Sequence, residues 1–257
     1  MSTATGDYAE HTPRGNGVWV TGDSVSALGA LAGLSFDYLC IDLQHGLFDP
    51  RRIPDAARVM RASTARLIVR VPWNRPEYIM HALDAGADDV IVPMVDDAAE
   101  AEAAVAAAHY PPLGSRSWGP ILPERSLSPV DANRAVGVFV MVETARGLEN
   151  VDRIVATPGL AGVYVGPNDL ALGIGEGRRT YRESEVIDGH LSRVAESCTR
   201  RGLVAGLHCS DPEMAGHWAA RGFGMRTIAT DSALLLSAAA GVLSRATGES
   251  SSVAGAY

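Results

Sequence analysis

The sequence contains no lysine, and the 22 residues counted together as lysine and arginine are all arginine. Catalysis through a side-chain Schiff base needs a lysine amine, and so does the usual attachment of pyridoxal phosphate. The phosphate-binding loop of Walker-type NTPases also carries a lysine. The absence therefore excludes lysine-dependent aldolases, pyridoxal phosphate enzymes and Walker-type NTPases as normally built. Any carbanion chemistry must be stabilised in another way.

Cysteines, long apolar runs and positive charge are also scarce. The three cysteines, Cys40, Cys198 and Cys209, are odd in number and widely spaced, which is typical of buried thiols in a reducing cytoplasm. No apolar run reaches the roughly 18–20 residues of a membrane span, and no secretory signal is visible at the N-terminus. A net charge of −8 argues against nucleic acid or an anionic membrane as the main partner. A small anionic substrate stays possible, because it needs only a local group of donors.

The 257 residues, 47% of them hydrophobic, suit one large domain. Short runs rich in Val and Ile alternate with helical patterns, and the runs are apolar on both faces, as buried parallel strands are. This alternation predicts a single (β/α)8 TIM barrel over residues 15–248, with loose ends at 1–14 and 249–257. An open doubly wound sheet is the alternative, weakened because no glycine-rich fingerprint follows the first run. The predicted strands are 17–21, 38–43, 67–71, 89–95, 138–143, 162–166, 204–208 and 225–229.

Amphipathic patterns predict helices at 50–64, 75–85 and 97–109, with Asp49 and Asp96 as N-caps and Gly86 as a stop. Two connections, 110–135 and 169–187, are too long for plain crossovers, and long connections in a compact domain are usually functional.

An extra C-terminal helix over 231–245 is apolar nearly all round. A surface helix of a monomer would show a polar stripe, so a lid over the barrel bottom or a partner subunit must cover it. We favour the partner subunit.

Polar side chains follow the predicted strands, and in a barrel the carboxyl ends of the strands form the active site. Two of them, Glu143 and Asp169, are carboxylates, and carboxylates with water suit a hard divalent cation such as Mg²⁺ or Mn²⁺. The alternatives are a salt bridge for Glu143 and a helix N-cap for Asp169. The full set of strand-end residues is Asp42, Gln44, His45, Arg70, Trp73, Asn74, Glu143 and Asp169.

His45 and Arg70 each have both a functional and a structural interpretation. His45 is a candidate general base because imidazole titrates near neutral pH, or else a core histidine. Arg70 is a donor to an oxyanion or carboxylate, or else it pairs with Asp42 inside the barrel. Asp84 lies near a helix end, where its position alone indicates a solvated residue.

Four segments, taken together and in order, resemble the HpcH/HpaI aldolase family of metal-dependent pyruvate aldolases. They are FDYLCIDLQHG, VRVPWNRPEYIMHALDAGADDVIVPMV, AAHYPPLGSRSWGP and VFVMVETARGLENVDRIVATPGLAGVYVGPNDLALGIG, and the likeness extends over about residues 16–245. The resemblance implies a (β/α)8 barrel in a homo-hexamer that swaps its last helix between subunits. It also implies cleavage of 4-hydroxy-2-oxo acids, such as 4-hydroxy-2-oxoheptanedioate, to pyruvate and an aldehyde.

The resemblance also assigns roles to residues. It implies that Glu143 of VET and Asp169 of GPNDL hold a divalent metal, Mg²⁺ first and Mn²⁺ or Co²⁺ also suitable. His45 of QHG resembles the family's base, oriented by an aspartate that matches Asp84. Arg70 resembles the arginine that contacts the pyruvate keto oxygen. The resemblance also implies that Asp42 is a further acidic residue of the active site. It implies substrate contacts for Trp73, Gly166, Pro167, Asn168 and His208.

The chain departs from the family pattern at four positions. Gln44 stands where many members have Glu, Met141 where many have Gln, Asn168 where Ala is common, and His208 where many are aliphatic. A thioether is only a weak acceptor, so Met141 cannot replace the glutamine hydrogen bond. These changes keep a decarboxylase or a biosynthetic C–C bond enzyme for oxaloacetate-like acids as an alternative. A catalytically inactive ligand-binding barrel is a lesser alternative, against which the retained Glu143, Asp169, His45 and Arg70 speak.

Overall fold

The computed structural model describes residues 12–125 and 127–248. Apart from residues 12–14, the predicted loose ends lie outside these residues. No helix in the described part of the chain is long and apolar enough to cross a membrane.

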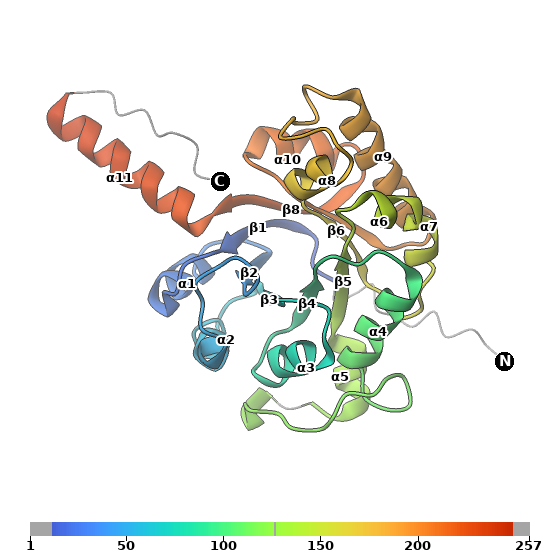
Figure 1. Ribbon diagram of the computed structural model, residues 1–257. Coiled ribbons are helices and arrows are strands. Elements are labelled where there is room, and N and C mark those ends of the chain that lie inside the picture. Colours follow the sequence, from blue (N-terminus) through green and yellow to red (C-terminus); the bar gives the residue numbers. More distant parts are fainter. Residues whose placement is uncertain (1–11, 126, 249–257) are drawn as a thin grey trace.

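Eight parallel strands form a closed barrel in the order β1 to β8 (Figure 1), which confirms the predicted fold. Closure comes from pairing of the first strand with the last, where Gly15 lies opposite Met225 and Trp19 opposite Thr230. The open-sheet alternative is therefore wrong. The strands are β1 Gly15–Val20, β2 Tyr38–Asp42, β3 Arg66–Arg70, β4 Asp89–Val92, β5 Gly137–Met141, β6 Gly162–Val165, β7 Val204–His208 and β8 Phe223–Thr230.

All the helices except the last, α11, surround the barrel (Figure 1). They are α1 Val25–Ala32, α2 Ile53–Val59, α3 Pro76–Asp84, α4 Ala98–Ala108, α5 Pro129–Ala135, α6 Ala145–Glu149, α7 Val151–Ile154, α8 Pro167–Gly173, α9 Glu185–Arg200, α10 Pro212–Ala219 and α11 Asp231–Thr247, with short 3₁₀ turns η2 Pro50–Arg52 and η3 Pro123–Arg125. The predicted long connections thus contain η3, α5 and α8.

Three predicted boundaries were wrong for local reasons. The N-cap of α4 is Asp97, whose Oδ1 accepts from the Glu100 N–H at 3.0 Å. Asp96, the predicted cap, instead accepts a hydrogen bond from the Thr144 hydroxyl. The fourth strand ends at Val92 because a proline follows and Met94 then takes a left-handed φ of 56°. The helix predicted to reach residue 64 ends at Val59.

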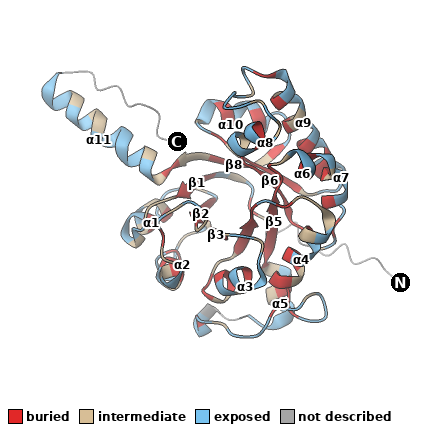
Figure 2. Cartoon of the chain, viewed as in Figure 1, coloured by how far each residue is buried: buried red, intermediate tan, exposed pale blue. Residues whose placement is uncertain are grey.

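The apolar core has two parts. Aliphatic side chains pack between the barrel and its helices, and a smaller cluster with several aromatic rings fills the barrel interior. Gly17 makes room for Tyr38, since a Cβ there would lie 2.3 Å from the ring. The hydroxyls of Tyr38 and Tyr164 both hydrogen-bond to Thr227, at 3.0 and 2.6 Å, so the buried phenols are satisfied. Figure 2 shows the strands as the buried centre of the molecule.

The last helix, α11, projects away from the barrel (Figures 1 and 2). None of its residues is buried, and five large apolar side chains on it are exposed, including Leu235 at 73% and Val242 at 60%. At its start, the Asp231 carboxylate accepts from the Thr21 and Gly22 N–H groups, which fixes its root to the barrel. The helix therefore does not form a lid over the barrel bottom.

Candidate active site

A cavity of about 460 Å³ opens at the carboxyl ends of the strands, and we call it the mouth cavity. The parallel strands bring these ends to one side of the barrel, so side chains far apart in sequence meet there. The sequence-predicted residues that line it are Asp42, His45, Arg70, Gly166, Pro167, Asn168, Asp169 and His208. The prediction of a shared site is thus supported by their placement.

Asp42 and Arg70 form a buried ion pair in one wall of the mouth cavity. They lie opposite each other in the β2–β3 register, and Asp42 Oδ1 and Oδ2 accept from Arg70 Nε and Nη2 at 2.9 and 2.6 Å. Burial opposes the charge on Asp42, but the hydrogen bonds and charge of Arg70 prevail and lower its pKa. The structural interpretation of Arg70 as an ion-pair partner is therefore confirmed.

The same carboxylate also holds the chain around His45. Asp42 Oδ1 accepts from the backbone N–H groups of Gln44 and His45 at 2.9 and 3.2 Å, and Oδ2 accepts from Trp19 Nε1 at 3.2 Å. Arg70 keeps one terminal nitrogen, Nη1, whose recorded contact is the weak acceptor Met141 Sδ at 4.0 Å. That nitrogen is available to a ligand oxygen in the mouth cavity.

Glu143 and Asp169 converge on one point beside Gly166. A Cβ on Gly166 would lie 3.1 Å from Glu143 Oε2 and 3.6 Å from Asp169 Oδ2, so glycine leaves the space between the two carboxylates open. The left-handed Met94 aims its N–H at Glu143 Oε1, at 2.9 Å. Glu143 Oε2 is buried and has no hydrogen-bond partner in the described structure.

Burial and a neighbouring carboxylate both disfavour the charged form of Glu143. Burial, and then the nearby charge of Asp169, raise its pKa to about 7, although the Met94 N–H opposes this shift. Neither alternative interpretation holds: Glu143 forms no salt bridge among the described residues, and Asp169 lies inside α8, whose N-cap is Gly166. An unsatisfied buried carboxylate oxygen beside a second carboxylate fits a hard divalent ion.

The described residues contain no group of three His, Cys, Asp or Glu side chains placed to hold a metal. Magnesium is commonly bound by one or two carboxylates, with water and substrate oxygens as the other ligands. The pair Glu143 and Asp169 therefore fits Mg²⁺ better than a closed zinc-type site, which needs four protein ligands.

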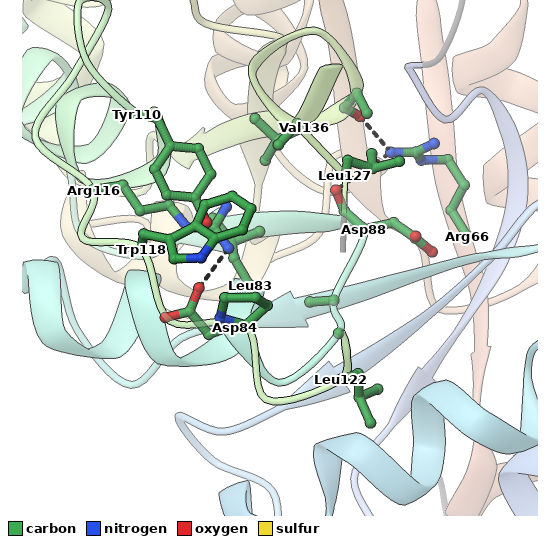
Figure 3. A pocket seen from close by; sticks show the side chains of 15 residues that line it. Arg66, Leu83, Asp84, Asp88, Tyr110, Arg116, Trp118, Leu122, Leu127 and Val136 are labelled. Carbon is green, nitrogen blue, oxygen red and sulfur yellow. Dashed lines mark hydrogen bonds and ion pairs between the residues drawn. The ribbon is translucent and has the colours of Figure 1, made fainter. Parts of the chain in front are cut away.

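Asp84 does not join the other predicted residues. It ends α3, which runs back from the mouth toward the start of β4, and its Oδ1 accepts from Arg116 Nη2 at 2.7 Å. Figure 3 shows this pair in a separate cavity of about 280 Å³, with Trp118 and Tyr110 beside it. Within one chain Asp84 thus lines a different cavity from His45, and its role in orienting His45 stays a prediction. The interpretation of Asp84 as a solvated residue is wrong, because it forms an ion pair and is largely buried.

Trp73 was also misplaced by the sequence. Its side chain is 50% exposed and does not line the mouth cavity, because the chain turns outward after β3. Its neighbour Asn74 donates from Nδ2 to the Glu100 carbonyl at 3.0 Å and so ties this turn to α4. Neither of these two strand-end residues lines the mouth cavity of the single chain, and the substrate contact of Trp73 stays a prediction.

His208 lies at the end of β7, half-buried, with its ring edge against Trp19 at 5.1 Å between ring centres. Burial, and then the positive charge of Arg70, lower its pKa to about 4. The imidazole is therefore neutral at physiological pH, and it faces the mouth cavity as a polar group without charge.

Sequence reasoning missed several lining residues: Trp19, Thr21, Tyr164, Leu172, Arg178, Thr230 and Ser232. Trp19 could have been found, because it lies two residues before the end of the first predicted strand. Arg178 belongs to the long connection 169–187, where length marked a functional loop but pointed to no residue. Thr230 and Ser232 reach the site only because β8 closes on β1.

The closed parallel barrel, with carboxylates, an arginine and histidines gathered at the carboxyl ends of its strands, has the architecture of a barrel enzyme. The chain belongs to the HpcH/HpaI aldolase/citrate lyase family, whose sequence model matches residues 16–238. Membership makes it an enzyme of the carbon–carbon lyase class that acts on small 2-oxo acids.

Named relatives agree with this assignment. The chain is 35% identical over 220 residues to a hydroxypyruvate/pyruvate aldolase of Rhizorhabdus wittichii, covering 84% of this chain and 88% of that one. It is 30% identical over 240 residues to a 4-hydroxy-2-oxo-heptane-1,7-dioate aldolase of Klebsiella pneumoniae, covering 90% and 89%. A solved HpcH/HpaI aldolase/citrate lyase family protein from Burkholderia cenocepacia superposes with a TM-score of 0.85 at 30% identity, covering 93% and 96%.

Proposed function

We propose that this protein is a divalent-metal-dependent aldolase that cleaves, or forms, 4-hydroxy-2-oxo acids by way of a pyruvate enolate. The observation that carries the proposal is the convergence of Glu143 and Asp169 on the open space beside Gly166, with one buried carboxylate oxygen unsatisfied. The names of the aldolase relatives support the substrate class. Because the chain has no lysine, the enolate must be stabilised by charge rather than by a Schiff base.

Glu143 and Asp169 would hold the metal, for which we propose Mg²⁺, with Mn²⁺ or Co²⁺ as substitutes. When bound, such an ion supplies electrophilic stabilisation of the negative charge that develops on the 2-oxo acid. Gly166 supports this arrangement, since any side chain there would press on Glu143 Oε2. Asn168, beside Asp169, and Pro167 form the adjoining edge of the mouth cavity and would contact the substrate.

The chain's own groups would perform the remaining steps. Arg70 Nη1 would donate to the developing oxyanion, while Asp42 fixes the guanidinium by its other two nitrogens. His45 would remove the proton from the C4 hydroxyl during cleavage and return it during synthesis. Trp19, Met141 and Tyr164 give this wall an apolar surface that limits water around the enolate.

Assembly and location complete the proposal. We propose a cytoplasmic homo-oligomer, a hexamer by resemblance, in which the exposed apolar face of α11 packs on another subunit. The three cysteines are free and buried, as a reducing compartment allows.

The proposal is tested by retro-aldol turnover. Cleavage of 4-hydroxy-2-oxoheptanedioate to pyruvate should be rapid with Mg²⁺, lost after treatment with EDTA, and restored when Mg²⁺ is added back. Oxaloacetate, assayed in parallel, separates aldolase from decarboxylase chemistry. Full turnover in metal-stripped buffer, or decarboxylation of oxaloacetate with no retro-aldol turnover, would contradict the proposal.

A further inference from the structure

The mouth cavity contains one arginine whose charge no part of the described chain neutralises. Two arginines line this cavity, Arg70 and Arg178. The Arg70 guanidinium is occupied by Asp42. Arg178, in the α8–α9 connection, makes no ion pair or side-chain hydrogen bond with residues 12–125 and 127–248. A guanidinium is always charged and presents a planar set of donors that matches a carboxylate.

The segment that carries Arg178 is built to hold its position. Glu176 anchors it, because its Oε2 accepts from Arg179 Nη1 at 3.3 Å and from the Ser184 hydroxyl at 2.8 Å. Gly175 and Gly177 take left-handed φ values of 82° and 67°, which lets the chain turn twice within four residues. Arg179 therefore forms its ion pair within the loop, with Glu176, whereas Arg178 lines the mouth cavity.

Arg178 shares the mouth cavity with Asp169, one of the proposed metal ligands. Asp169 lies in α8, nine residues earlier in the chain, and its carboxylate approaches that of Glu143 beside Gly166. Leu172, on α8 between them in sequence, is 56% exposed and lines the same cavity. The mouth cavity is thus lined by a proposed metal ligand, an exposed apolar side chain, and an arginine that forms no ion pair with the described residues.

We infer that Arg178 is a specificity-determining residue that binds a carboxylate at the far end of the substrate, away from the 2-oxo group. This inference rests on the proposed function and narrows its substrate class to 4-hydroxy-2-oxo acids, and acceptor aldehydes, with a second carboxylate. Arg178 is exposed to solvent where it lines the cavity, so an ion pair there contributes modestly unless the guanidinium binds the carboxylate through two hydrogen bonds. We expect a preference of roughly 2- to 10-fold for a dicarboxylate over the matched monocarboxylate.

The test compares two ligands that lack the C4 hydroxyl and so cannot be cleaved: 2-oxoheptanedioate and 2-oxoheptanoate. Calorimetry on the Mg²⁺-loaded protein should show tighter binding of the dioate. Arg178→Ala should remove that preference and leave binding of 2-oxoheptanoate within about twofold, while Arg178→Lys should keep part of it. Arg179→Ala is the matched control, since it removes a charge from the same loop at a paired position, and it should keep the preference.

A second measurement separates this inference from the proposed function. Exchange of the pyruvate methyl protons in D₂O, followed by NMR, reports enolate formation and requires no acceptor aldehyde. Arg178→Ala should exchange at the wild-type rate. Equal binding of the two ligands by the wild type, or a preference that survives in Arg178→Ala, would overturn the role of Arg178 even where exchange proceeds. Absence of exchange would count against the proposed function, and the binding preference would still decide the role of Arg178.

Discussion

Glu143 combines deep burial, a single backbone hydrogen bond and an unsatisfied oxygen, and each property follows from its place after β5. Glu143 follows the end of β5 by two residues, and the left-handed Met94 of the neighbouring connection donates a hydrogen bond to Oε1 alone. A buried carboxylate is unfavourable in its charged form, so burial, together with the nearby charge of Asp169, raises its pKa to about 7. A buried carboxylate with an unsatisfied oxygen does not stabilise the fold, so binding of a ligand explains the presence of Glu143 better than a contribution to stability does.

We predict that Glu143→Gln and Asp169→Asn each lower turnover by at least about 100-fold and abolish binding of Mg²⁺ measured by calorimetry. The physical reason is that each substitution removes one of two anionic ligands while keeping the shape of the side chain. Circular dichroism should show an unchanged fold. The exposed Glu149→Gln is the control and should behave as wild type. Normal metal binding in both site variants would place the metal elsewhere.

His45 is exposed where it lines the mouth cavity. Its backbone N–H donates a hydrogen bond to the Asp42 carboxylate, which holds this part of the chain in place. If it is the base, His45→Ala should lose about 10²- to 10⁴-fold in retro-aldol turnover, with binding of pyruvate largely retained. Steady-state kinetics and calorimetry measure the two effects separately. Near-normal turnover would make His45 a structural residue.

His208 carries a prediction about pH. Its pKa is about 4 in the folded protein and about 6.5 in an unfolded chain, so the unfolded state takes up the proton first as pH falls. The stability associated with neutral His208 is thus complete above about pH 6.5 and is lost as pH falls toward 4, by about 1–3 kcal/mol. Chemical denaturation of the wild type and of His208→Phe at several pH values measures it. The substitution should flatten the dependence between pH 4 and 6.5, and equal slopes would show the assignment to be wrong.

At the scale of elements, the barrel interior depends on pairing small residues with aromatic ones across neighbouring strands. Gly17 on β1 lies against the Tyr38 ring on β2, and Gly206 on β7 lies against the Tyr164 ring on β6. Both tyrosines are fully buried and hydrogen-bonded to Thr227, so neither ring can move aside cheaply. These glycines are needed for space rather than for an unusual backbone conformation.

We therefore predict that Gly17→Ala lowers the free energy of unfolding by about 2–3 kcal/mol or more, because the new Cβ would lie 2.3 Å from the Tyr38 ring. Gly189→Ala in α9 is the matched control, since nothing lies within 4 Å of a Cβ there. In an exposed helix that change should be neutral or stabilising by up to about 1 kcal/mol. Urea denaturation compares the two, and a larger loss for Gly189→Ala would refute this account of the interior.

At the scale of the whole molecule, α11 is the element that a single chain leaves unpacked. Its seventeen residues include no buried one, and Leu235, Val242 and Leu243 are each more than half exposed. Burying one such side chain contributes on the order of 1.5–3 kcal/mol, so an apolar arm in water is both unfavourable and prone to association. The anchoring of Asp231 to Thr21 and Gly22 shows that the arm has a defined root.

We predict that the intact chain is a stable homo-oligomer and that Leu235→Glu with Val242→Glu dissociates it. The two residues lie seven apart, on one face of the helix, so the paired charges should face the partner. Removal of α11 altogether should yield aggregate or unstable protomer. Ser237→Glu, on the opposite face, is the control. Light scattering decides the matter: a mass near 27.0 kDa for the intact chain at micromolar concentration would exclude this assembly.

Much of the fold and part of the site followed from the sequence by itself. Alternating apolar runs and helical patterns determined the (β/α)8 class, and their order placed Asp42, His45, Arg70 and Asp169 at one end of it, because parallel strands expose their carboxyl ends together. The missing lysine determined, without any structure, that a Schiff base has no role. These conclusions depend only on local periodicity, residue identity and the direction of the chain.

The tertiary structure alone decided the rest. Closure of β8 on β1 brought Thr230 to the mouth cavity, the return path of α3 carried Asp84 away from His45, and the folding of the α8–α9 connection brought Arg178 in. The position of each of these residues depends on the path of the helix or loop that carries it. That path is set by packing between segments that are far apart in sequence. Residue spacing along the chain determines which side of a strand or helix a side chain occupies, but it contains no information on which distant segment it will meet.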